Sequence, residues 1–559
     1  MNKIKALLNQ KQTELFDKLV TAFKVTAAFR QNDVYFRNLD MQSSISKHTL
    51  RVRHQLEDCN GSGAGSYKIT FTCLSESSDE WAKFSEICSV CDENIYKILS
   101  ATGFKRLATL NKYRRLYDGG FKMSRDDIFG LGSVIKAYYD NEAEKKEIVE
   151  FMAGIGINEF ENRTNLQMVL ESINNKTAAN KDEGVKIVKS EVFGLLGRRE
   201  RVVIAVAGGS GSGKTFIASE LVSWLPDVTV FTLDDYYKDR RWITENLNSN
   251  FDDPGAINLD LAREHLMSLK NGETIMRPRR SLEKGFVTGY SEVKPCKMIV
   301  VEGIFTLNEK LADLFDYSIF IEANLHGKLL RRLMRDIGKT GQDFEGILLQ
   351  YVSTVQPMYE KHIEVTKNAA NLIINNEFAP YCETYDKINR FEFKIRCPFD
   401  LPLETLKKHG AVLISEAKQI DKYYVAPGLN FMESDELLRI REENSKLTLT
   451  YKGPRKGSFQ RPRIDFAINM KFAEVLIYLG YSNVITTAKT RYKFKIEADC
   501  ELDIAVDDVK NLGVFIEVRV GSETGEKKAG QFLKSLGLEL KPETNKGYFE
   551  DILKKTFAI

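Results

Sequence analysis

The chain has 559 residues, of which 43% are hydrophobic, enough to build several packed cores and to exclude disorder as the dominant state. At roughly 150 residues per domain, this length predicts about three or four domains. The 81 basic and 78 acidic residues give a net charge of +3, so the global basic excess of a dedicated nucleic-acid binder is excluded and any anion binding must be local.

The cysteine content and the apolar runs indicate the compartment. Eight cysteines over this length are too sparse for a disulfide framework of the secreted kind, which favours a reducing environment. The N-terminus lacks the apolar core of a signal peptide, and no apolar run reaches the ~20 residues that span a bilayer. We therefore expect a cytoplasmic protein without a membrane or nucleic-acid partner.

Two polar stretches, 174–184 and 375–386, have few apolar residues, as linkers do. They divide the chain into three predicted domains, 1–185, 186–380 and 381–559. The outer two share four motifs in the same order, at offsets of 388, 388, 377 and 381 residues, which predicts two copies of one fold. The matched motifs are Gln31-x-Asp33 with Gln419-x-Asp421, Arg51-x-Arg53 with Arg439-x-Arg441, Lys112-x-Arg114 with Lys489-x-Arg491, and Asp126-Asp127 with Asp507-Asp508.

Within each copy, apolar and polar residues alternate with a period of two, as in 438–441 and 447–452. This pattern predicts strands with one apolar and one basic face, and several such strands would form a sheet or barrel with a cationic side. For any single strand, a solvated outer face is the simpler interpretation. Because Arg and Lys recur at matched positions in both copies, we favour an anion-binding lumen.

In the middle domain, the apolar run 201–207 predicts a buried parallel strand, and it leads directly into the segment G-x-x-x-x-G-K-T. The backbone N–H groups of such a loop surround phosphate oxygens, and the following helix presents its positive N-terminus. Lys214 supplies a point charge and Thr215 a hydroxyl for Mg²⁺. We therefore predict an ATP phosphate site made by Gly208, Gly209, Ser210, Gly211, Ser212, Gly213, Lys214 and Thr215.

Two further predicted strands end in acids, at Asp234-Asp235 and at Glu302. Because ligands gather at the carboxyl ends of parallel strands, these carboxylates should face the phosphates, with Glu302 as a Mg²⁺ or water ligand. Plain surface capping is the alternative for Glu302. Farther on, Arg332 and Arg335 lie three apart on one predicted helix face, where both can clamp a transferring phosphoryl group. An exposed basic helix is the alternative there.

With these residues in view, the segment from about 200 to 375 resembles the uridine kinase and phosphoribulokinase family of P-loop kinases. The resemblance rests on 208–215, 234–239, 250–254, 301–304, 331–336, 350–351 and 356–357. It implies a parallel sheet with helices on both faces. It also implies Asp234 as the base that accepts the substrate hydroxyl proton, Asp252 and Tyr237 as substrate contacts, and Arg332 and Arg335 as lid residues.

One departure from this family concerns the acceptor. Uridine kinases carry a Pro-x-Tyr-Asp segment that helps to hold the pyrimidine, whereas the corresponding run here is Arg277-Pro278-Arg279-Arg280-Ser281. Arginines suit an acidic or already phosphorylated acceptor better than neutral uridine. We therefore expect an ATP-dependent small-molecule kinase whose acceptor, of nucleoside or sugar-phosphate type, contacts Arg279 and Arg280.

The segment from about 391 to 553 resembles the CYTH family, also called triphosphate tunnel metalloenzymes, which includes class IV adenylate cyclases and inorganic triphosphatases. The resemblance implies a closed antiparallel barrel whose basic lumen holds a triphosphate. The implied phosphate contacts are Lys394, Arg439, Arg441, Lys452, Lys489 and Arg491. Fusion of such a domain to a uridine-kinase-like domain also resembles a plant group of tunnel enzymes that hydrolyse pyrophosphate or triphosphate.

The acidic motifs of this family are only half present. Glu392 and Glu517 remain, but Arg390 and Arg519 stand where a second acid is expected. Because metal sites need convergent oxygen ligands, we expect Glu392 and Glu517 to hold Mg²⁺ or Mn²⁺ only weakly, with the phosphate-binding cations retained. The N-terminal copy has diverged further, since Lys136 stands where the other copy has Glu517, and a binding or structural role is expected for it.

Three functions therefore remain open from the sequence. The leading one is the kinase, with tunnel-like flanking domains that bind phosphate-rich ligands. The second is a C-terminal triphosphatase, pyrophosphatase or nucleotide cyclase, with the P-loop domain as a regulator. The third is that both flanking domains are inert scaffolds.

Overall fold

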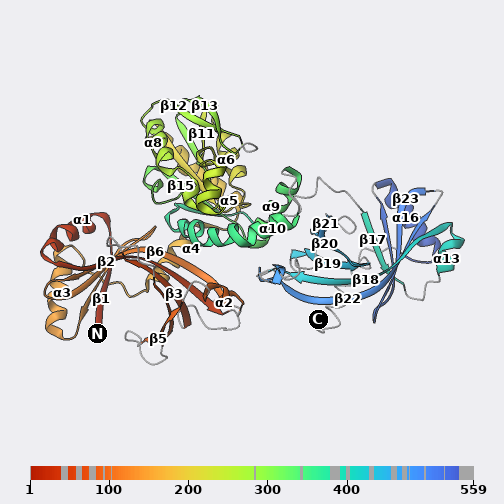
Figure 1. Ribbon diagram of the computed structural model, residues 1–559, viewed down its shortest axis with the longest axis horizontal. Coiled ribbons are helices and arrows are strands. Elements are labelled where there is room, and N and C mark those ends of the chain that lie inside the picture. The colour runs from red at the N-terminus through yellow and green to blue at the C-terminus, as the bar shows by residue number, and fades with distance from the viewer. Residues whose placement is uncertain are drawn as a thin grey trace. The chain divides into compact units, whose positions relative to one another are not determined.

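The computed structural model forms two compact units, Met1–Asn324 with Ser353–Glu377, and Leu325–Val352 with Phe378–Ile559. Figure 1 labels the elements for which there is room. No helix among the described residues is long and apolar enough to cross a membrane. The structure describes residues 2–38, 48–57, 66–74, 84–91, 95–101, 104–281, 285–339, 344–377, 391–397, 403–426, 434–454, 463–468, 475–477, 479–496, 499–520 and 523–539.

The first unit begins with an eight-stranded antiparallel sheet of order β1-β8-β7-β6-β2-β3-β4-β5 (Figure 1, red to orange). Its strands are β1 (Asn2–Leu8), β2 (Lys24–Asn38), β3 (His48–Glu57), β4 (Ser66–Leu74), β5 (Phe84–Cys91), β6 (Phe104–Asp118), β7 (Lys122–Ile128) and β8 (Gly132–Tyr139). Helices α1 (Gln10–Leu19), α2 (Ile95–Ala101) and α3 (Glu142–Gly154) accompany it.

The predicted alternation is present in the first strand of this sheet. Ile4, Ala6 and Leu8 pack into a core with Phe16 of α1 and Met152 of α3. Because successive strand residues point to opposite faces, Lys3 and Lys5, which flank Ile4, lie on the other face of the sheet. Around β1, one face of the sheet is therefore apolar and packs with α1 and α3, whereas the opposite face carries the two lysines.

The same unit continues with a six-stranded parallel sheet of order β11-β14-β10-β15-β16-β9. Its strands are β9 (Thr177–Ala178), β10 (Val202–Gly208), β11 (Val228–Thr232), β14 (Met298–Glu302), β15 (Tyr317–Glu322) and β16 (Leu372–Asn375), with an antiparallel pair, β12 (Ile275–Arg280) and β13 (Val287–Val293), beside it. The helices are α4 (Asn165–Asn175), α5 (Lys181–Leu196), α6 (Lys214–Val222), α7 (Arg240–Leu247), α8 (Leu259–Lys270) and α11 (Gln356–Met358).

Two cores cover the two faces of the parallel sheet. Val203 and Ala205 of β10 pack with α8, whereas Val202 and Ile204 pack with α5 and α6. The predicted parallel sheet with helices on both faces is therefore confirmed. Helix α5 runs unbroken from Lys181 to Leu196, so the proposed 185/186 boundary lies inside a helix that packs on the parallel sheet.

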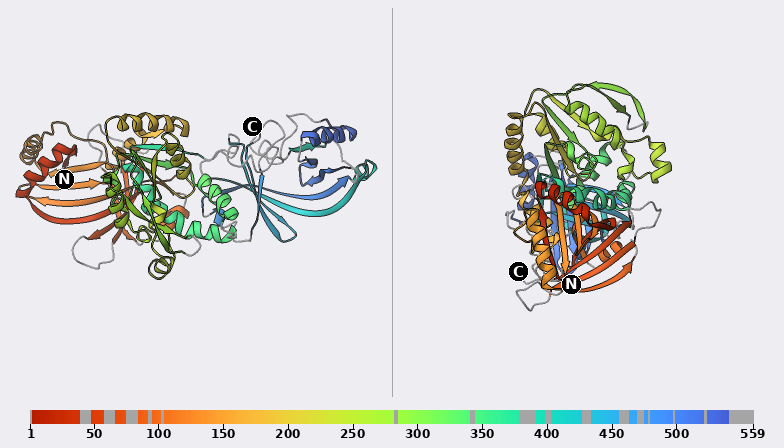
Figure 2. Two further views of the ribbon diagram at one scale, coloured as in Figure 1. Left: turned by 90° about the horizontal axis from the view of Figure 1, so that it is seen from above. Right: turned by 90° about the vertical axis from the view of Figure 1, so that its left-hand side faces the viewer.

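The second unit contains an eight-stranded antiparallel sheet of order β17-β24-β23-β22-β18-β19-β20-β21, whose long strands are strongly curved (Figure 2). The strands are β17 (Phe391–Arg396), β18 (Ala411–Val425), β19 (Leu437–Glu443), β20 (Lys446–Lys452), β21 (Arg463–Ile468), β22 (Ser482–Ile496), β23 (Asp499–Val509) and β24 (Gly513–Val520). Its helices include α9 (Leu325–Lys339), α10 (Phe344–Gln350), α13 (Leu403–Lys408) and α16 (Glu523–Ser535).

The two antiparallel sheets have the same strand order, element by element. The order β1-β8-β7-β6-β2-β3-β4-β5 becomes β17-β24-β23-β22-β18-β19-β20-β21 when each strand is replaced by its sequence counterpart. The predicted duplication is therefore present in the fold. Closed barrels are not found, because within the described ranges β1 does not pair with β5 and β17 does not pair with β21.

Candidate functional site

The phosphate loop joins strand β10 to helix α6. Gly208, Gly211 and Gly213 have φ angles of 143°, 78° and 95°, which residues with a side chain rarely adopt. A Cβ at Gly208 would lie 2.4 Å from the carbonyl oxygen of Ile321, so this position also needs glycine for space. The loop leads into the N-terminus of α6, and the backbone N–H groups and the dipole at the N-terminus of a helix favour an anion.

Lys214 and Thr215 open helix α6 beside this loop. The Lys214 Nζ donates a 2.9 Å hydrogen bond to the carbonyl oxygen of Gly209. The Thr215 side chain hydrogen-bonds Glu302, the last residue of β14, and burial raises the pKa of that carboxyl while Thr215 and Lys214 act in the opposite direction. A hydroxyl and a carboxylate side by side at a phosphate loop are oxygen donors that fit Mg²⁺.

Two aspartates follow strand β11, which pairs with β14 and so ends at the same edge of the sheet as Glu302. Asp234 is exposed, and its negative charge acts to raise the pKa of both Glu302 and Asp235. Burial is the larger cause of the raised pKa of Asp235, and its carboxylate lies 3.4 Å from Nε of Arg277. The structure thus places Lys214, Thr215, Asp234 and Glu302 in one site.

The predicted acceptor contacts lie in the segment that follows these aspartates. Tyr237 forms a β-bridge with Ile257, and its ring centroid lies 6.0 Å from that of Phe251. Asp252, the next residue, is only 8% exposed. These contacts place the Tyr237 and Asp252 segments side by side.

The arginines of strand β12 have different environments. Arg277 pairs with Asp235, as described above. The guanidinium of Arg280 donates to the carbonyl oxygens of Tyr237, Lys238 (2.6 Å) and Gly285 (3.0 Å), so it holds the backbone of the acceptor segment. Arg279 is exposed. Of the two arginines predicted to contact an acceptor, Arg279 is the one that presents an exposed side chain.

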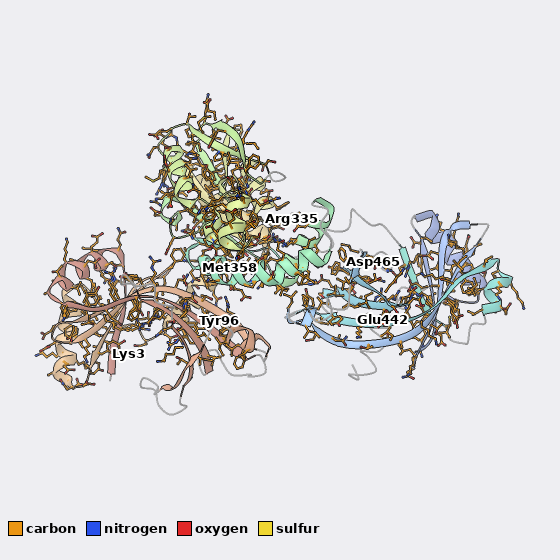
Figure 3. The ribbon with its side chains drawn as sticks, viewed as in Figure 1. Lys3, Tyr96, Arg335, Met358, Glu442 and Asp465 are labelled. Carbon is orange, nitrogen blue, oxygen red and sulfur yellow. The ribbon has the colours of Figure 1, made fainter. Side chains whose placement is uncertain are left out.

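The predicted lid arginines lie on α9, in the second unit (Figure 3 labels Arg335). Arg332 donates a 2.9 Å hydrogen bond to Oε1 of Gln350 on α10. Both arginines also pair with Asp336, at 3.3 Å for Arg332 and 2.6 Å for Arg335. Because Arg332 and Arg335 both contact the carboxylate of Asp336, the two arginines lie close together on α9.

Helix α9 is held to the C-terminal sheet by a histidine at its start. Nδ1 of His326 lies 2.8 Å from the Tyr481 hydroxyl, and Nε2 lies 3.3 Å from Oε1 of Glu436. The Tyr451 hydroxyl donates a 2.5 Å hydrogen bond to the same oxygen of Glu436. Sequence reasoning missed this cluster, because its four residues come from separate segments without a local motif.

The cations predicted to bind phosphate in the C-terminal domain come together on one face of its sheet. We call Lys394, Arg439, Arg441, Lys452, Lys489 and Arg491 the C-terminal basic face. Asp421 accepts hydrogen bonds of 2.7 and 2.8 Å from Arg441, and Asp507 accepts 2.6 and 3.0 Å bonds from Arg491 and Lys489. Lys489 and Arg491 counteract the effect of burial and hold the pKa of Asp507 at about 2. Sequence reasoning used both aspartates only as repeat markers and missed their role as counter-ions.

The two acids that remain of the family's acidic motifs, Glu392 and Glu517, form ion pairs with cations. Glu392 accepts 2.7 and 2.8 Å hydrogen bonds from Lys452, and Glu517 pairs with Lys394 at 2.6 Å. Arg519 contacts Glu517 and lies 3.9 Å from Glu392. No group of three or more His, Cys, Asp or Glu suited to a metal occurs in the part of the chain that the structure describes. As it stands, this donor set does not fit a divalent metal.

In the N-terminal copy, lysines stand at the positions where the C-terminal copy has acids. β1 pairs with β8 as β17 pairs with β24, so Lys3 and Lys5 occupy the positions of Glu392 and Lys394 (Figure 3 labels Lys3). Lys136 occupies the position of Glu517, as the sequence comparison predicts. Sequence reasoning missed β1 as a counterpart of β17. The two segments Lys3-Ile4-Lys5 and Glu392-Phe393-Lys394 share the same alternation of charged and apolar residues, and this similarity could have identified β1 as the counterpart of β17.

Comparison with known proteins agrees with both resemblances. The phosphoribulokinase / uridine kinase family matches residues 203–378, and the CYTH domain matches residues 390–548. The uridine kinase of Halobacterium salinarum is 38% identical over 176 residues, which cover 31% of this chain and 78% of that protein. The chain belongs to the phosphoribulokinase / uridine kinase family. It joins a uridine kinase-like, ATP-dependent phosphotransferase domain to a CYTH domain.

Two other relatives match over more residues than the kinase domain contains. Uridine-cytidine kinase C of Dictyostelium discoideum is 29% identical over 346 residues, 60% of this chain and 75% of that protein. Inorganic pyrophosphatase TTM2 of Arabidopsis thaliana is 28% identical over 298 residues, half of this chain but only 41% of that protein. The two families in general use ATP and divalent metal ions, and they bind nucleotides, small-molecule substrates and triphosphates.

Proposed function

We propose that the chain is an ATP- and Mg²⁺-dependent kinase that phosphorylates a small molecule of nucleoside or sugar-phosphate type, in the cytoplasm. The observation that supports this most is the group at the carboxyl edge of the parallel sheet. There Lys214 lies beside the phosphate loop, the Thr215–Glu302 pair offers oxygen ligands for Mg²⁺, and Asp234 is exposed next to them. When bound, Mg²⁺ would screen the negative charge of the phosphates.

Each residue of this group has a role in the transfer. Lys214 stabilises the charge that develops on the β- and γ-phosphates. Asp234 accepts the proton of the acceptor hydroxyl. The hydroxyl oxygen then bonds to the γ-phosphorus of ATP. The bond from that phosphorus to the oxygen that bridges the β- and γ-phosphates breaks, and ADP leaves. Asp252 and Tyr237 position the acceptor, and Arg279 attracts its negative charge.

The test is incubation of the full chain with Mg²⁺–ATP and a panel of nucleosides, sugar phosphates or water alone, with products identified by mass spectrometry. We expect Lys214→Ala to abolish transfer, and Asp234→Asn to retain ATP binding while turnover falls at least a hundredfold. Asp260→Asn is the control, because this exposed aspartate lies on α8 and pairs only with Lys310 in the described structure. Unchanged turnover in both site variants would contradict the proposal.

The second candidate is cleavage of triphosphate or pyrophosphate, or nucleotide cyclisation, by the C-terminal domain under regulation by the P-loop domain. It is favoured by the match to a protein named an inorganic pyrophosphatase. The C-terminal basic face supports binding of such ligands, whereas the contact of Arg519 with Glu517 opposes a metal there. The water-alone arm, repeated with triphosphate and with Mg²⁺ or Mn²⁺, tests it by phosphate release, and Glu517→Gln should abolish any release.

A further inference from the structure

The N-terminal antiparallel sheet lies outside both family matches, which begin at residues 203 and 390. Within the first compact unit it contacts a stretch of the kinase domain that we call the 359–369 segment. This segment consists of a π-helical turn, η6 (Tyr359–Ile363), and a 3₁₀ helix, η7 (Glu364–Ala369), and it precedes β16 of the parallel sheet. Because π-helical turns are rare and occur often at functional sites, this segment is a candidate for a role in the kinase reaction.

Arg106 of β6 supplies the charged part of this contact. Its Nη1 donates a 2.8 Å hydrogen bond to the backbone carbonyl oxygen of Glu360, and its Nη2 lies 2.9 Å from the carboxylate of the same residue. Nη1 also lies 3.9 Å from the carboxylate of Glu364. The Arg106 side chain is 17% exposed, so solvent screens these ion pairs less than pairs on an open surface. One guanidinium therefore fixes both the backbone and the side chain of Glu360.

Two further contacts hold the other end of the 359–369 segment. Nδ2 of Asn368 donates a 3.3 Å hydrogen bond to the backbone carbonyl oxygen of Thr109, which is also in β6. Gly130, between β7 and β8, has a φ angle of 77°, and a Cβ there would lie 2.2 Å from the carbonyl carbon of Asn368. Glycine at this position lets the two backbones approach closely. The N-terminal sheet therefore contacts the 359–369 segment near both of its ends.

The same segment is also part of the kinase core. Tyr359 and Ile363 are buried in the same core as Val203 and Ala205 of β10. Strand β10 ends in the phosphate loop. Because protein cores are close-packed and transmit strain, a shift of the segment displaces the residues that pack against β10. The 359–369 segment thus contacts both the N-terminal sheet and the core that supports the phosphate loop.

A chain of ion pairs connects the segment to the end of β15. Nζ of Lys367 lies 3.5 Å from a carboxylate oxygen of Glu364 and 3.3 Å from one of Glu322. Burial acts to lower the pKa of Lys367, but the two acids outweigh this effect and raise it. Glu322 is the last residue of β15, directly after Ile321, which is the parallel partner of Gly208. The chain of charges that begins in β6 therefore continues to the strand beside the phosphate loop.

We propose that Arg106 is a positioning residue for the phosphoryl transfer proposed above, and that the N-terminal sheet braces the ATP site through it. Arg106 and Lys367 together neutralise the carboxylates of Glu322, Glu360 and Glu364. Without Arg106, the two acids of the 359–369 segment lose the cation that they share, so they draw Lys367 away from Glu322. The end of β15 and the phosphate loop beside it are then held less firmly. ATP should therefore be affected more than the acceptor, whose expected contacts lie in other segments.

Arg106→Gln in the full chain tests this role by ATP affinity and by hydrogen exchange. Calorimetry with Mg²⁺–ATP gives the Kd, and the Lys214→Ala chain identifies which binding belongs to the phosphate loop. We expect the Kd of that site to rise about threefold to tenfold, and exchange to become faster in peptides that cover 206–216 and 359–377. In turnover, the KM for ATP should rise while the KM for the acceptor stays within a factor of about two.

A conservative variant and a matched control accompany this test. Arg106→Lys should recover part of the affinity, because an ammonium still pairs with Glu360 although it cannot also bind two oxygens as a guanidinium does. The control is Arg115→Gln, which removes an arginine of the same strand whose 2.7 Å ion pair, with Asp127, lies within the N-terminal sheet. It should leave the Kd and the exchange of both regions unchanged.

The deciding experiment combines Arg106→Gln with Glu322→Gln. If the chain of ion pairs carries the effect, Arg106→Gln adds nothing to the Kd of the Glu322→Gln chain. Multiplication of the two separate effects, or an equal rise of the Kd in Arg115→Gln, would overturn the proposal. An unchanged Kd in Arg106→Gln would overturn it too, and a lower melting temperature would then indicate a structural role alone. Affinity and exchange are read without turnover, so they decide this proposal even where a substrate panel without any phosphorylated product contradicts the kinase function.

Discussion

The side-chain amide of Asn376 donates a 2.7 Å hydrogen bond to the backbone carbonyl of Ser212, in the middle of the phosphate loop. Asn376 follows strand β16, and its own backbone N–H donates to the carbonyl of Glu322 at the end of β15. A Cβ at Gly213 would lie 2.2 Å from Nδ2 of Asn376, so glycine at that position makes room for the contact. The loop is thus braced by a residue more than 160 positions away in the chain.

We expect Asn376→Ala to weaken ATP binding. One buried hydrogen bond contributes about 1 kcal/mol, so the KM for ATP should rise about fivefold, with a smaller effect on the KM of the acceptor. Asn371→Ala is the control, because Asn371 accepts hydrogen bonds from Ser318 in the same sheet without contacting the loop. Steady-state kinetics and melting temperatures of both variants separate a loop effect from general destabilisation. An equal rise of the ATP KM in both variants would count against a specific role.

Arg279 and Arg280 should differ in their effects on the kinase reaction. Arg279 is exposed, so Arg279→Gln should raise the KM for an anionic acceptor about tenfold and leave the KM for ATP almost unchanged. Arg280 holds three backbone carbonyl groups, so Arg280→Gln should lower kcat and the melting temperature instead. The measurement is the KM and kcat for each substrate with the acceptor found in the panel. If the best acceptor is neutral and its KM is the same in Arg279→Gln as in the wild type, the acceptor is not selected by charge.

The phosphate loop could be predicted from the sequence because its signal is local. A buried strand, glycines that tolerate positive φ, and a lysine at the start of a helix all lie within fifteen residues, and the structure has them in that form. The duplication was also predictable, because matched motifs kept their order while the loops between them changed length. The same applies to Asp234 and Glu302, since parallel strands bring their carboxyl ends to one edge.

The parts that could not be predicted depend on contacts between distant segments. Nothing local in the sequence indicates that Asp421 and Asp507 neutralise the cations of the C-terminal basic face, or that Asn376 braces the phosphate loop. Similarly, the 174–184 stretch appears linker-like from its composition, yet it contains strand β9, which pairs with β16, and the start of α5. Pairing with a distant strand supplies the stability that the local sequence lacks.

Burial and the charge of Lys136 lower the pKa of Lys5 to about 8, and this shift predicts a pH dependence of stability. Between pH 8 and pH 10.5 the unfolded state keeps a proton on this lysine that the folded state has lost, so stability rises with pH across this window. Lys5→Met removes the buried charge, so at pH 7 we expect it to stabilise the protein by about 1–2 kcal/mol, or roughly 3–6 °C in the first melting transition.

This gain should shrink as the pH rises above 8, and it should disappear only above about pH 10.5, where Lys5 is neutral in the unfolded wild type as well as in the folded one. Melting curves of both proteins from pH 7 to pH 10 make the comparison, and Lys11→Met on the exposed face of α1 is the control. A gain that stays constant with pH would mean that Lys5→Met acts through packing alone.

The last prediction concerns Arg519, which contacts Glu517, lies 3.9 Å from Glu392, and so occupies the place between the two acids of the C-terminal domain. Arg519→Glu replaces this cation by a third carboxylate, and three convergent carboxylates can hold Mn²⁺ or Mg²⁺. We expect calorimetry to show Mn²⁺ binding that the wild type lacks or has at least tenfold weaker, and metal-dependent release of phosphate from triphosphate to increase. Lys422→Glu makes the same charge change on an exposed lysine of β18 and should alter neither quantity. If the wild type already hydrolyses triphosphate rapidly with metal, Arg519 does not block the site, and the second candidate function takes precedence over the first.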